Sequence, residues 1–305
     1  MIFNLDIAGF GVRVDVDAAF GSFRLPAPYA PFRADAPDTA AGAHLLTLKV
    51  RPGVASSPEL IEGMTPVATG INDLGEARLF ADGDRYSVAL SPMPGAGFRF
   101  MKMEPGFASA ELRLHPADRF AAFTVDSMLR ILFSQAVVDR GAFMLHASAV
   151  VADGRAYLFM GKSGTGKSTH ARQWMKAFPG AELLNDDNPI VRLLPDGALR
   201  VYGSPWSGKT RCYRNESAPV AGFVRLRQAP LNSYRAAADI EAFVAILPGV
   251  SVITHSRPLY QRVCSTLTAA AALVPVGILD CRPDEDAART CRAALADSCG
   301  SYASI

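Results

Sequence analysis

The stretch Gly161-Lys162-Ser163-Gly164-Thr165-Gly166-Lys167-Ser168 decides the fold of this chain, because it matches the pattern G-x-x-x-x-G-K-[ST] in full. Its glycines let successive backbone N–H groups surround phosphate oxygens without obstruction by Cβ atoms. Lys167 supplies a positive charge for β- and γ-phosphates, and the Ser168 hydroxyl is placed to bind Mg²⁺. Thr169 is a candidate contact for the α-phosphate. This P-loop, or Walker A, pattern predicts a nucleotide site made by Gly161, Ser163, Gly164, Thr165, Gly166, Lys167, Ser168 and Thr169.

The sequence around this loop matters, because a glycine-rich turn can match eight residues by coincidence. An apolar strand is expected at 157–160, directly before the loop, and a helix at 168–178, directly after it. Pro179-Gly180 then ends the helix. A phosphate loop requires this strand-loop-helix order, so the context favours nucleotide binding over coincidence.

Two carboxylates follow the next expected strand, at 182–185. Asp186 lies nineteen residues beyond Lys167 and is followed by Asp187. At the C-terminal end of a strand next to the phosphate-loop strand, both would face the γ-phosphate and its metal. One would bind Mg²⁺, and the other would accept a proton from an attacking hydroxyl. The alternative is a solvated Asp-Asp turn, or a helix cap. Only nineteen residues separate Lys167 from Asp186. Motor, transporter and AAA-type ATPases carry their acidic strand much further along the chain, so this spacing argues against those classes.

Two further segments are candidates for the site. His146 lies on the strand expected before the loop, where its imidazole would approach the acidic pair and tune its protonation; the alternative is a structural histidine. The segment 203–210 is a loop of small residues that would approach a ligand, or an ordinary turn packed on the core. The candidate substrate contacts are Ser204, Trp206 and Lys209 in this segment and Arg211 directly after it.

Periodicity divides the chain near residue 116. Residues 1–116 predict a β-rich domain with an antiparallel sheet of its own, with strands at 3–7, 10–16, 45–50, 76–80, 85–90, 97–102 and 109–114. A Pro- and Ala-rich loop is expected at 26–42. Residues 117–305 predict an α/β domain, so the whole chain is α+β. It would begin with a helix at 118–139 capped by Asp118 and contain a hairpin at 143–160. It would end with helices at 237–247, 258–273 (capped by Ser256) and 284–295, and a strand at 276–280.

Composition narrows the function classes. The chain has 305 residues, of which 50% are hydrophobic and 20% charged, so it is not a disordered, collagen-like or coiled-coil chain. Its 31 basic and 29 acidic residues argue against a nucleic-acid partner bound through a broad basic face. The apolar runs are too short to span a membrane. Five cysteines without a C-x-x-C pair favour a reduced, cytoplasmic setting over disulfides or zinc.

Three segments together resemble the HPr kinase/phosphorylase family: Leu145-His146-Ala147-Ser148, the phosphate loop, and Leu184-Asn185-Asp186-Asp187. More closely, they resemble the smaller HPr-kinase-like proteins of peptide-modification gene clusters, in which a G-S-P-W segment like the one at 203–206 recurs. The resemblance covers about residues 117–300 and implies a P-loop nucleotide fold of the phosphoenolpyruvate-carboxykinase type. It implies ATP bound by the loop, Mg²⁺ held with Ser168, and Asp186 as the base toward a substrate serine. It also implies that Asp187 supports the metal and His146.

The sequence departs from the bifunctional members of that family in several places. Thr169 stands where they usually carry Glu, and Ala147 stands where Gly follows their histidine. The downstream basic segment associated with phosphorolysis is missing, and residues 1–116 do not resemble their regulatory domain. The resemblance therefore implies ATP-dependent kinase chemistry without implying HPr as the acceptor.

Three functions remain open from the sequence. The first is a kinase that transfers the γ-phosphoryl group of ATP to a hydroxyl, most simply a serine or threonine of a small protein or peptide. The second is a small-molecule hydroxyl kinase, which would use the same residues. The third is a regulatory module that binds ATP without transferring phosphate. In both kinases, Lys167, Asp186, Asp187 and His146 are the candidate catalytic residues, and Ser168 and Asp187 are the candidate Mg²⁺ ligands. No residue pattern identifies the acceptor.

Overall fold

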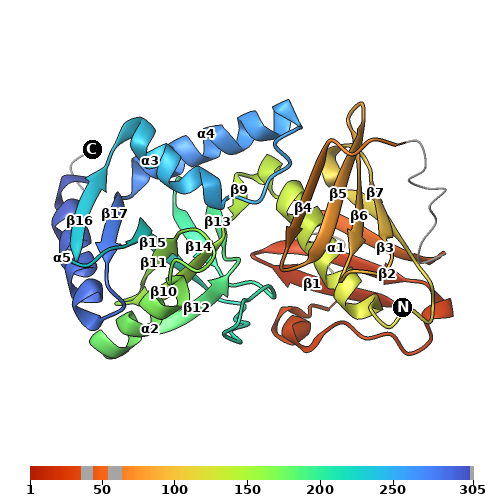
Figure 1. The fold of residues 1–305 in the computed structure, drawn as a ribbon, viewed down its shortest axis with the longest axis horizontal. Helices are drawn as coiled ribbons and strands as arrows, with labels where there is room; N and C mark the ends of the chain where they lie inside the picture. Colours follow the sequence, from red (N-terminus) through yellow and green to blue (C-terminus); the bar gives the residue numbers. More distant parts are fainter. Residues whose placement is uncertain (36–43, 54–63, 303–305) are drawn as a thin grey trace. The chain divides into compact units, whose positions relative to one another are not determined.

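The computed structural model describes residues 1–35, 44–53 and 64–302. It is a mixed α/β structure with two sheets, and its contacts divide the chain into two compact units, Met1–Val137 and Val138–Ile305 (Figure 1). In the described part of the chain, no helix is both long enough and apolar enough to cross a membrane.

The first unit is built on an eight-stranded sheet with the order β1-β2-β3-β8-β7-β6-β5-β4. Alternating side chains form it: in β2, Val12, Val14 and Val16 are fully buried, and the residues between them are partly exposed. The strands are β1 (Ile2–Ile7), β2 (Phe10–Val16), β3 (Leu46–Pro52), β4 (Ala68–Asn72), β5 (Gly75–Asp82), β6 (Arg85–Ser91), β7 (Arg99–Met103) and β8 (Ser109–Leu114).

The expected strands of this unit are confirmed to within about two residues at most ends, whereas β4 was not predicted. The expectation of a purely antiparallel sheet was wrong, because β3 runs parallel to both β2 and β8. Residues 27–32 of the expected loop form a 3-10 helix, η2 (Ala27–Phe32), and residues 36–42 of that loop lie outside the described residues. Among the described residues, the further 3-10 helices are η1 (Ala18–Phe20), η4 (Pro105–Phe107), η5 (Val138–Arg140) and η6 (Leu247–Gly249).

Helix α1 (Ala121–Ala136) covers a face of the first sheet and contacts β3, β7 and β8 (Figure 1). It buries the stripe Val125, Met128, Leu129, Leu132 and Phe133 there. The structure therefore places the division between units after this helix, at residue 137, whereas the sequence analysis placed it before the helix, at 116.

Asp118 does not cap α1 as expected, because the N-cap residue is Phe120. Its carboxylate instead forms a buried two-pronged ion pair with Arg99, with both N–O distances 2.8 Å. Its Oδ1 atom also accepts the N–H of Phe120 at 2.9 Å, so the carboxylate binds the residue just before the helix.

The second unit contains a nine-stranded sheet whose main path is β12-β10-β11-β15-β14-β13-β9. Strand β17 runs parallel to β15, and β16 pairs with β17. The strands are β9 (Ala142–Met144), β10 (Ala147–Ala152), β11 (Arg155–Met160), β12 (Glu182–Asp187), β13 (Ile190–Leu193), β14 (Leu199–Tyr202), β15 (Ser217–Gln228), β16 (Ser233–Ala237) and β17 (Val276–Cys281). The first strand of the hairpin expected at 143–160 is thus divided in two, with a break at 145–146.

Four α-helices accompany this sheet: α2 (Lys167–Ala177), α3 (Asp239–Ile246), α4 (Arg257–Leu273) and α5 (Glu285–Tyr302). Helices α2 and α5 pack together against the strands through a core that includes Phe159, Trp174, Val224 and Leu279. All four helices were expected at these places. Ser256 is the N-cap residue of α4, but its side chain makes no capping hydrogen bond.

The order of the strands determines where the site lies. Strand β10 pairs antiparallel with both β11 and β12, so it lies between them. The sequence analysis expected the acidic strand, β12, to be the direct neighbour of the phosphate-loop strand, β11, and this was wrong. Because β11 and β12 then run in the same direction, their C-terminal ends meet at one edge of the sheet, where β10 begins. Residues 146–148, 161–168 and 185–187 converge at that edge.

Candidate functional site

The phosphate loop connects β11, which ends at Met160, to α2, which begins at Lys167. Gly164 and Gly166 have φ angles of 81° and 103°, in the region that only glycine adopts without strain. The N–H of Thr165 donates to the Lys162 carbonyl at 3.1 Å, which closes the turn. The loop thus brings the free N–H groups of the first turn of α2 to the sheet edge, an arrangement that binds anions.

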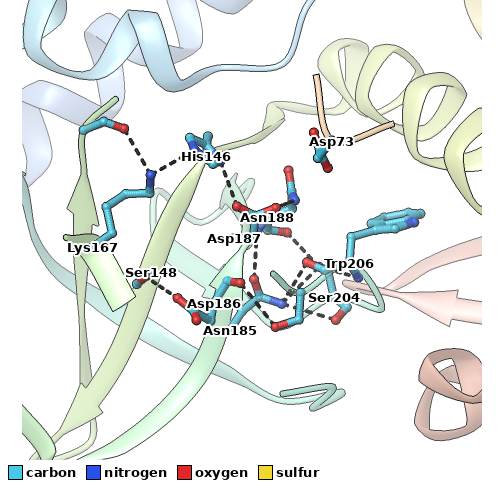
Figure 2. A network of polar contacts seen from close by, with 12 residues as sticks. Asp73, His146, Ser148, Lys167, Asn185, Asp186, Asp187, Asn188, Ser204 and Trp206 are labelled. Atoms are coloured by element: carbon cyan, nitrogen blue, oxygen red, sulfur yellow. Dashed lines mark hydrogen bonds and ion pairs between the residues drawn. The ribbon is translucent and has the colours of Figure 1, made fainter. Parts of the chain in front are cut away.

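Lys167 is 8% exposed and reaches back across the loop. Its Nζ atom donates to the Gly161 carbonyl at 3.2 Å and lies 2.9 Å from Nε2 of His146 (Figure 2). Burial lowers the pKa of Lys167, and the negative charges of Asp187 and Asp186 act in the opposite direction. This side chain is therefore a buried cation between the loop and the acidic strand.

His146 links Lys167 to the acidic pair. Its Nδ1 atom lies 3.0 Å from Oδ1 of Asp187, and the two side chains are 39% and 22% exposed. Because an ammonium group only donates hydrogen bonds, Nε2 accepts from Lys167 and Nδ1 carries the hydrogen that is donated to Asp187. The sequence left both a site role and a structural role open for His146. In the structure it bridges Lys167 of the phosphate loop and the carboxylate of Asp187.

Asp186 is only 2% exposed and is held from the neighbouring strand. The strand register pairs it with Ser148, whose buried hydroxyl donates to Oδ1 at 2.5 Å. The other oxygen, Oδ2, is buried and has no hydrogen-bond partner among the described residues. A buried carboxylate oxygen without a partner is costly, so its presence here points to a function for this atom. The role of Ser148 was not predicted.

Asn185 fastens the acidic strand to the loop at 203–210. Its Nδ2 atom donates to both the carbonyl and the Oγ atom of Ser204, at 3.2 and 3.1 Å, while its Oδ1 atom accepts the N–H of Asn188 at 2.9 Å (Figure 2). The Ser204 hydroxyl donates to the Asn188 carbonyl at 2.7 Å. In the sequence, the signal for these contacts is a polar residue, Asn185, at the end of an apolar strand. The sequence analysis predicted no role for it.

The loop at 203–210 also holds the backbone of the acidic pair. Ser207 forms a bridge with Asp187, and the N–H of Gly208 donates to the Asp186 carbonyl. Asp187 has a φ angle of 150°, which L-residues rarely adopt, so these contacts hold a strained backbone at the site.

The four residues predicted to contact substrate fall into two groups. Ser204 is fully buried and Trp206 is 3% exposed, so both support the acidic strand in this structure and present little surface to a ligand. Lys209 and Arg211 are exposed on the same loop.

The donors near the loop suit Mg²⁺. Carboxylate and hydroxyl oxygens are the ligands it prefers, and Asp187 and Ser168 carry such oxygens; Oδ2 of Asp186 also has no hydrogen-bond partner among the described residues. Within the described ranges, no group of three or more His, Cys, Asp and Glu side chains is placed to hold a metal ion. Mg²⁺ is commonly held by one or two protein oxygens while phosphates and water complete its shell, and the Asp187 and Ser168 oxygens fit that pattern.

Ser148 is expected to position Asp186. In Ser148→Ala the carboxylate would lose its hydroxyl donor inside a buried site, so we expect the free energy of unfolding to fall by about 1–3 kcal/mol. We also expect turnover to fall by roughly tenfold or more, while the affinity for ATP changes less than threefold. Urea unfolding, ATP titration and turnover measure the three quantities. Ser265→Ala removes a hydroxyl that donates only along its own helix and serves as the control. Unchanged turnover in Ser148→Ala would contradict the positioning role.

His170, in the first turns of α2, makes the stability of this unit sensitive to acid. Burial lowers its pKa from 6.5 to about 4, and its Nε2 atom accepts the indole N–H of Trp174 at 3.0 Å. Between pH 6.5 and 4 the unfolded chain binds a proton that the folded chain does not, so stability falls as the pH falls through this range. We expect a loss of about 2 kcal/mol between pH 7 and pH 5.

The substitution His170→Gln keeps an acceptor for Trp174 and removes the titrating group. Urea unfolding of the wild type and this variant at pH 7 and pH 5 should therefore show a smaller pH dependence in the variant. An equal loss of stability in both proteins would assign the effect to other groups.

Comparisons with known proteins give little further information. No protein-family model matches the sequence, and no curated protein matches it. A solved structure that is similar to this chain is the Hpr(Ser) kinase/phosphatase from Coxiella burnetii, at 15% sequence identity and a TM-score of 0.31. That match covers 52% of this chain and 96% of the other.

Proposed function

We propose that residues 138–302 bind ATP with Mg²⁺ and transfer its γ-phosphoryl group to a hydroxyl, as an HPr-kinase-like P-loop enzyme of the phosphoenolpyruvate-carboxykinase type. One observation carries the proposal: Lys167 and the carboxylate of Asp187, from segments twenty residues apart, are joined through His146 at one sheet edge. The Lys167–His146 and His146–Asp187 distances are 2.9 and 3.0 Å. A buried cation beside carboxylates at the mouth of a phosphate loop is the arrangement that phosphoryl transfer uses.

Binding is assigned to the loop and its lysine. The free N–H groups at the start of α2 and the Nζ atom of Lys167 bind the β- and γ-phosphates, while Thr169 contacts the α-phosphate. Because the Nζ atom now donates to His146, a bound phosphate competes with Nε2 of His146 for that donor. Mg²⁺ held by Ser168 and Asp187 would neutralise charge on the phosphates as it develops.

The transfer step is assigned to Asp186. As the bond between the γ-phosphorus and the ADP oxygen breaks, the acceptor oxygen bonds to phosphorus and its proton passes to Oδ2 of Asp186. That oxygen has no hydrogen-bond partner among the described residues, so it has lone pairs available for the proton. It is also shielded from solvent, so the groups covering it must move when an acceptor binds. Asp187, which lies 3.0 Å from Nδ1 of His146, would support both the metal and this histidine.

The proposed acceptor is a serine or threonine of a small protein or peptide, with a small-molecule alcohol as the alternative. Lys209 and Arg211 are exposed on the loop fastened to the acidic strand, where they offer positive charge to an acceptor. The thiols of Cys212, Cys264, Cys281 and Cys291 are free, which supports a reduced, cytoplasmic setting. No nucleic acid or membrane is proposed as a partner.

Transfer of labelled phosphate tests the proposal. The protein is incubated with γ-labelled ATP and Mg²⁺, together with proteins and peptides encoded beside it and, separately, with small alcohols. A labelled product that disappears when Mg²⁺ is removed supports a kinase, and its identity distinguishes the two acceptor classes. Label lost only to water would contradict transfer to a hydroxyl.

A second candidate function is a regulatory module that holds ATP without transferring phosphate. The burial of Asp186 favours it, because a base must reach the hydroxyl that it deprotonates. This candidate requires tight ATP binding together with no labelled product from any acceptor.

A further inference from the structure

Lys209 and Arg211 are two exposed cations on the loop that contacts the acidic strand. Neither has an ion-pair partner among the described residues. Arg214, three residues beyond Arg211, is instead paired with Glu182 at 2.7 Å and with Glu216 at 3.3 Å. The segment 203–213 contains no acidic residue, so it does not compensate the charge of these two cations itself.

Both ends of the short span 209–211 are anchored to β12. On one side, the N–H of Gly208 donates to the carbonyl of Asp186. On the other side, the thiol of Cys212 donates to the Leu183 carbonyl at 3.2 Å. Only three residues lie between these two anchors. The backbone that carries the two cations is therefore held along the strand that carries the proposed base.

The packing of Gly208 shows how closely this loop approaches the acidic pair (Figure 2). A Cβ atom at position 208 would lie 3.0 Å from the carbonyl of Asp186 and 3.3 Å from the Cβ atom of Asp187. The Oγ atom of Ser207 lies 2.6 Å from the carbonyl of Thr210, which closes a turn around residues 208 and 209. The loop is thus a fixed part of the site.

The charges of the proposed complex leave these two cations available for the acceptor. The donor phosphates are assigned to the phosphate loop, Lys167 and Mg²⁺, none of which involves residues 209–211. An acceptor that reaches Asp186 comes close to two carboxylates and the phosphates, all of which are negative. Positive groups beside a site raise the local concentration of ligands of opposite charge and offset such repulsion.

We infer that the acceptor hydroxyl belongs to an acidic peptide segment, in which Asp or Glu residues flank the serine or threonine and bind Lys209 and Arg211. The inference rests on the proposed function, because the hydroxyl must reach Asp186 while its flanking residues contact the span 209–211. The planar guanidinium of Arg211 can bind a carboxylate through two parallel hydrogen bonds, and Lys209 adds a point charge. Because a single exposed ion pair contributes little, several carboxylates near the hydroxyl are expected.

Peptide libraries test the inference. Three libraries share a central serine and differ only in the flanking positions, which hold Asp and Glu, Asn and Gln, or Lys and Arg. Initial transfer rates from γ-labelled ATP are measured with each library. We expect the wild type to label the acidic library at least fivefold faster than the neutral one, and the basic library most slowly. The preference should weaken between about 0.05 and about 0.5 M salt, because exposed charges are screened.

Charge reversal shows whether the two cations are responsible. In the double variant Lys209→Glu, Arg211→Glu, the acidic preference should be lost or reversed in favour of the basic library. ATP affinity should change by less than threefold. The control double variant, Lys176→Glu, Arg257→Glu, makes the same change in net charge at exposed positions of α2 and α4. It should keep the preference of the wild type.

Failure of the inference is distinguishable from failure of the proposed function. Equal labelling of the acidic and neutral libraries by the wild type would overturn the inference, as would an acidic preference retained after charge reversal. Labelling of a protein or an alcohol but of no peptide library would overturn it as well. A wild type that labels no acceptor of any kind would instead overturn the proposed function.

Peptide binding gives a second reading that needs no transfer. Fluorescein-labelled acidic and neutral peptides carry alanine in place of the serine, and their affinities are measured by fluorescence anisotropy. The wild type should bind the acidic peptide at least fivefold more tightly than the neutral one. The variant Lys209→Glu, Arg211→Glu should lose this difference. Equal affinities of the wild type for the two peptides would contradict the inference.

Discussion

Lys167→Ala is expected to abolish phosphoryl transfer, lowering the rate by about a thousandfold or more. The Nζ atom is the buried cation of the site, and in the proposed complex it compensates charge on the β- and γ-phosphates. Alanine removes that charge and also leaves Nε2 of His146 without its donor at 2.9 Å. ATP affinity should fall as well, because the ground-state phosphates use the same ammonium group. Calorimetric titration and labelled transfer measure the two losses.

The matched control is Lys176→Ala, which removes the same charge from the exposed last turn of the same helix. It should bind ATP and transfer phosphate as the wild type does. If Lys167→Ala retained transfer within threefold of the wild type, the loop would not be the site of the phosphates.

Asp186→Asn is expected to separate binding from transfer. The substitution keeps the size of the side chain and an oxygen that accepts the Ser148 hydroxyl, but it removes the basic oxygen Oδ2. Loss of a general base typically lowers turnover by about 10²–10⁴-fold. ATP affinity should change by less than threefold, because the phosphates are held by the loop and Lys167.

Two controls accompany this variant. Asp196→Asn changes an exposed turn aspartate in the same unit, and it should behave as the wild type. Circular dichroism and urea unfolding show whether the new amide, buried without a partner, has unfolded the protein. Full transfer by folded Asp186→Asn would remove Asp186 from the role of base.

Local chemistry made much of the second unit predictable. The strand, loop and helix around 157–178 follow from glycines that permit positive φ angles, a buried apolar strand and a Pro-Gly helix stop. The turn between β10 and β11 could also be predicted from the sequence, because Asp-Gly pairs favour turns with positive φ angles. Asp153 and Gly154 both adopt such angles. In each case, the conformation is determined by residues within one turn of each other.

What sequence reasoning missed depends on contacts across the sheet. Strand β15 was not expected, because Pro219 and Gly222 interrupt it and its buried run lacks alternation. The hydrogen bond from Ser148 to Asp186 joins residues thirty-eight positions apart, and it follows from the pairing of β10 with β12. The position of β10 between the loop strand and the acidic strand likewise follows from tertiary pairing.

Transfer from γ-labelled ATP to an acceptor, followed in parallel with ATP binding, tests most directly whether the loop and the acidic strand form one catalytic site. The wild type, Lys167→Ala and Asp186→Asn are compared under identical Mg²⁺ concentrations. The wild type should bind ATP and label the acceptor, Lys167→Ala should do neither well, and Asp186→Asn should bind ATP without labelling. Tight ATP binding by the wild type with no labelled acceptor, or equal labelling by Asp186→Asn, would contradict this assignment.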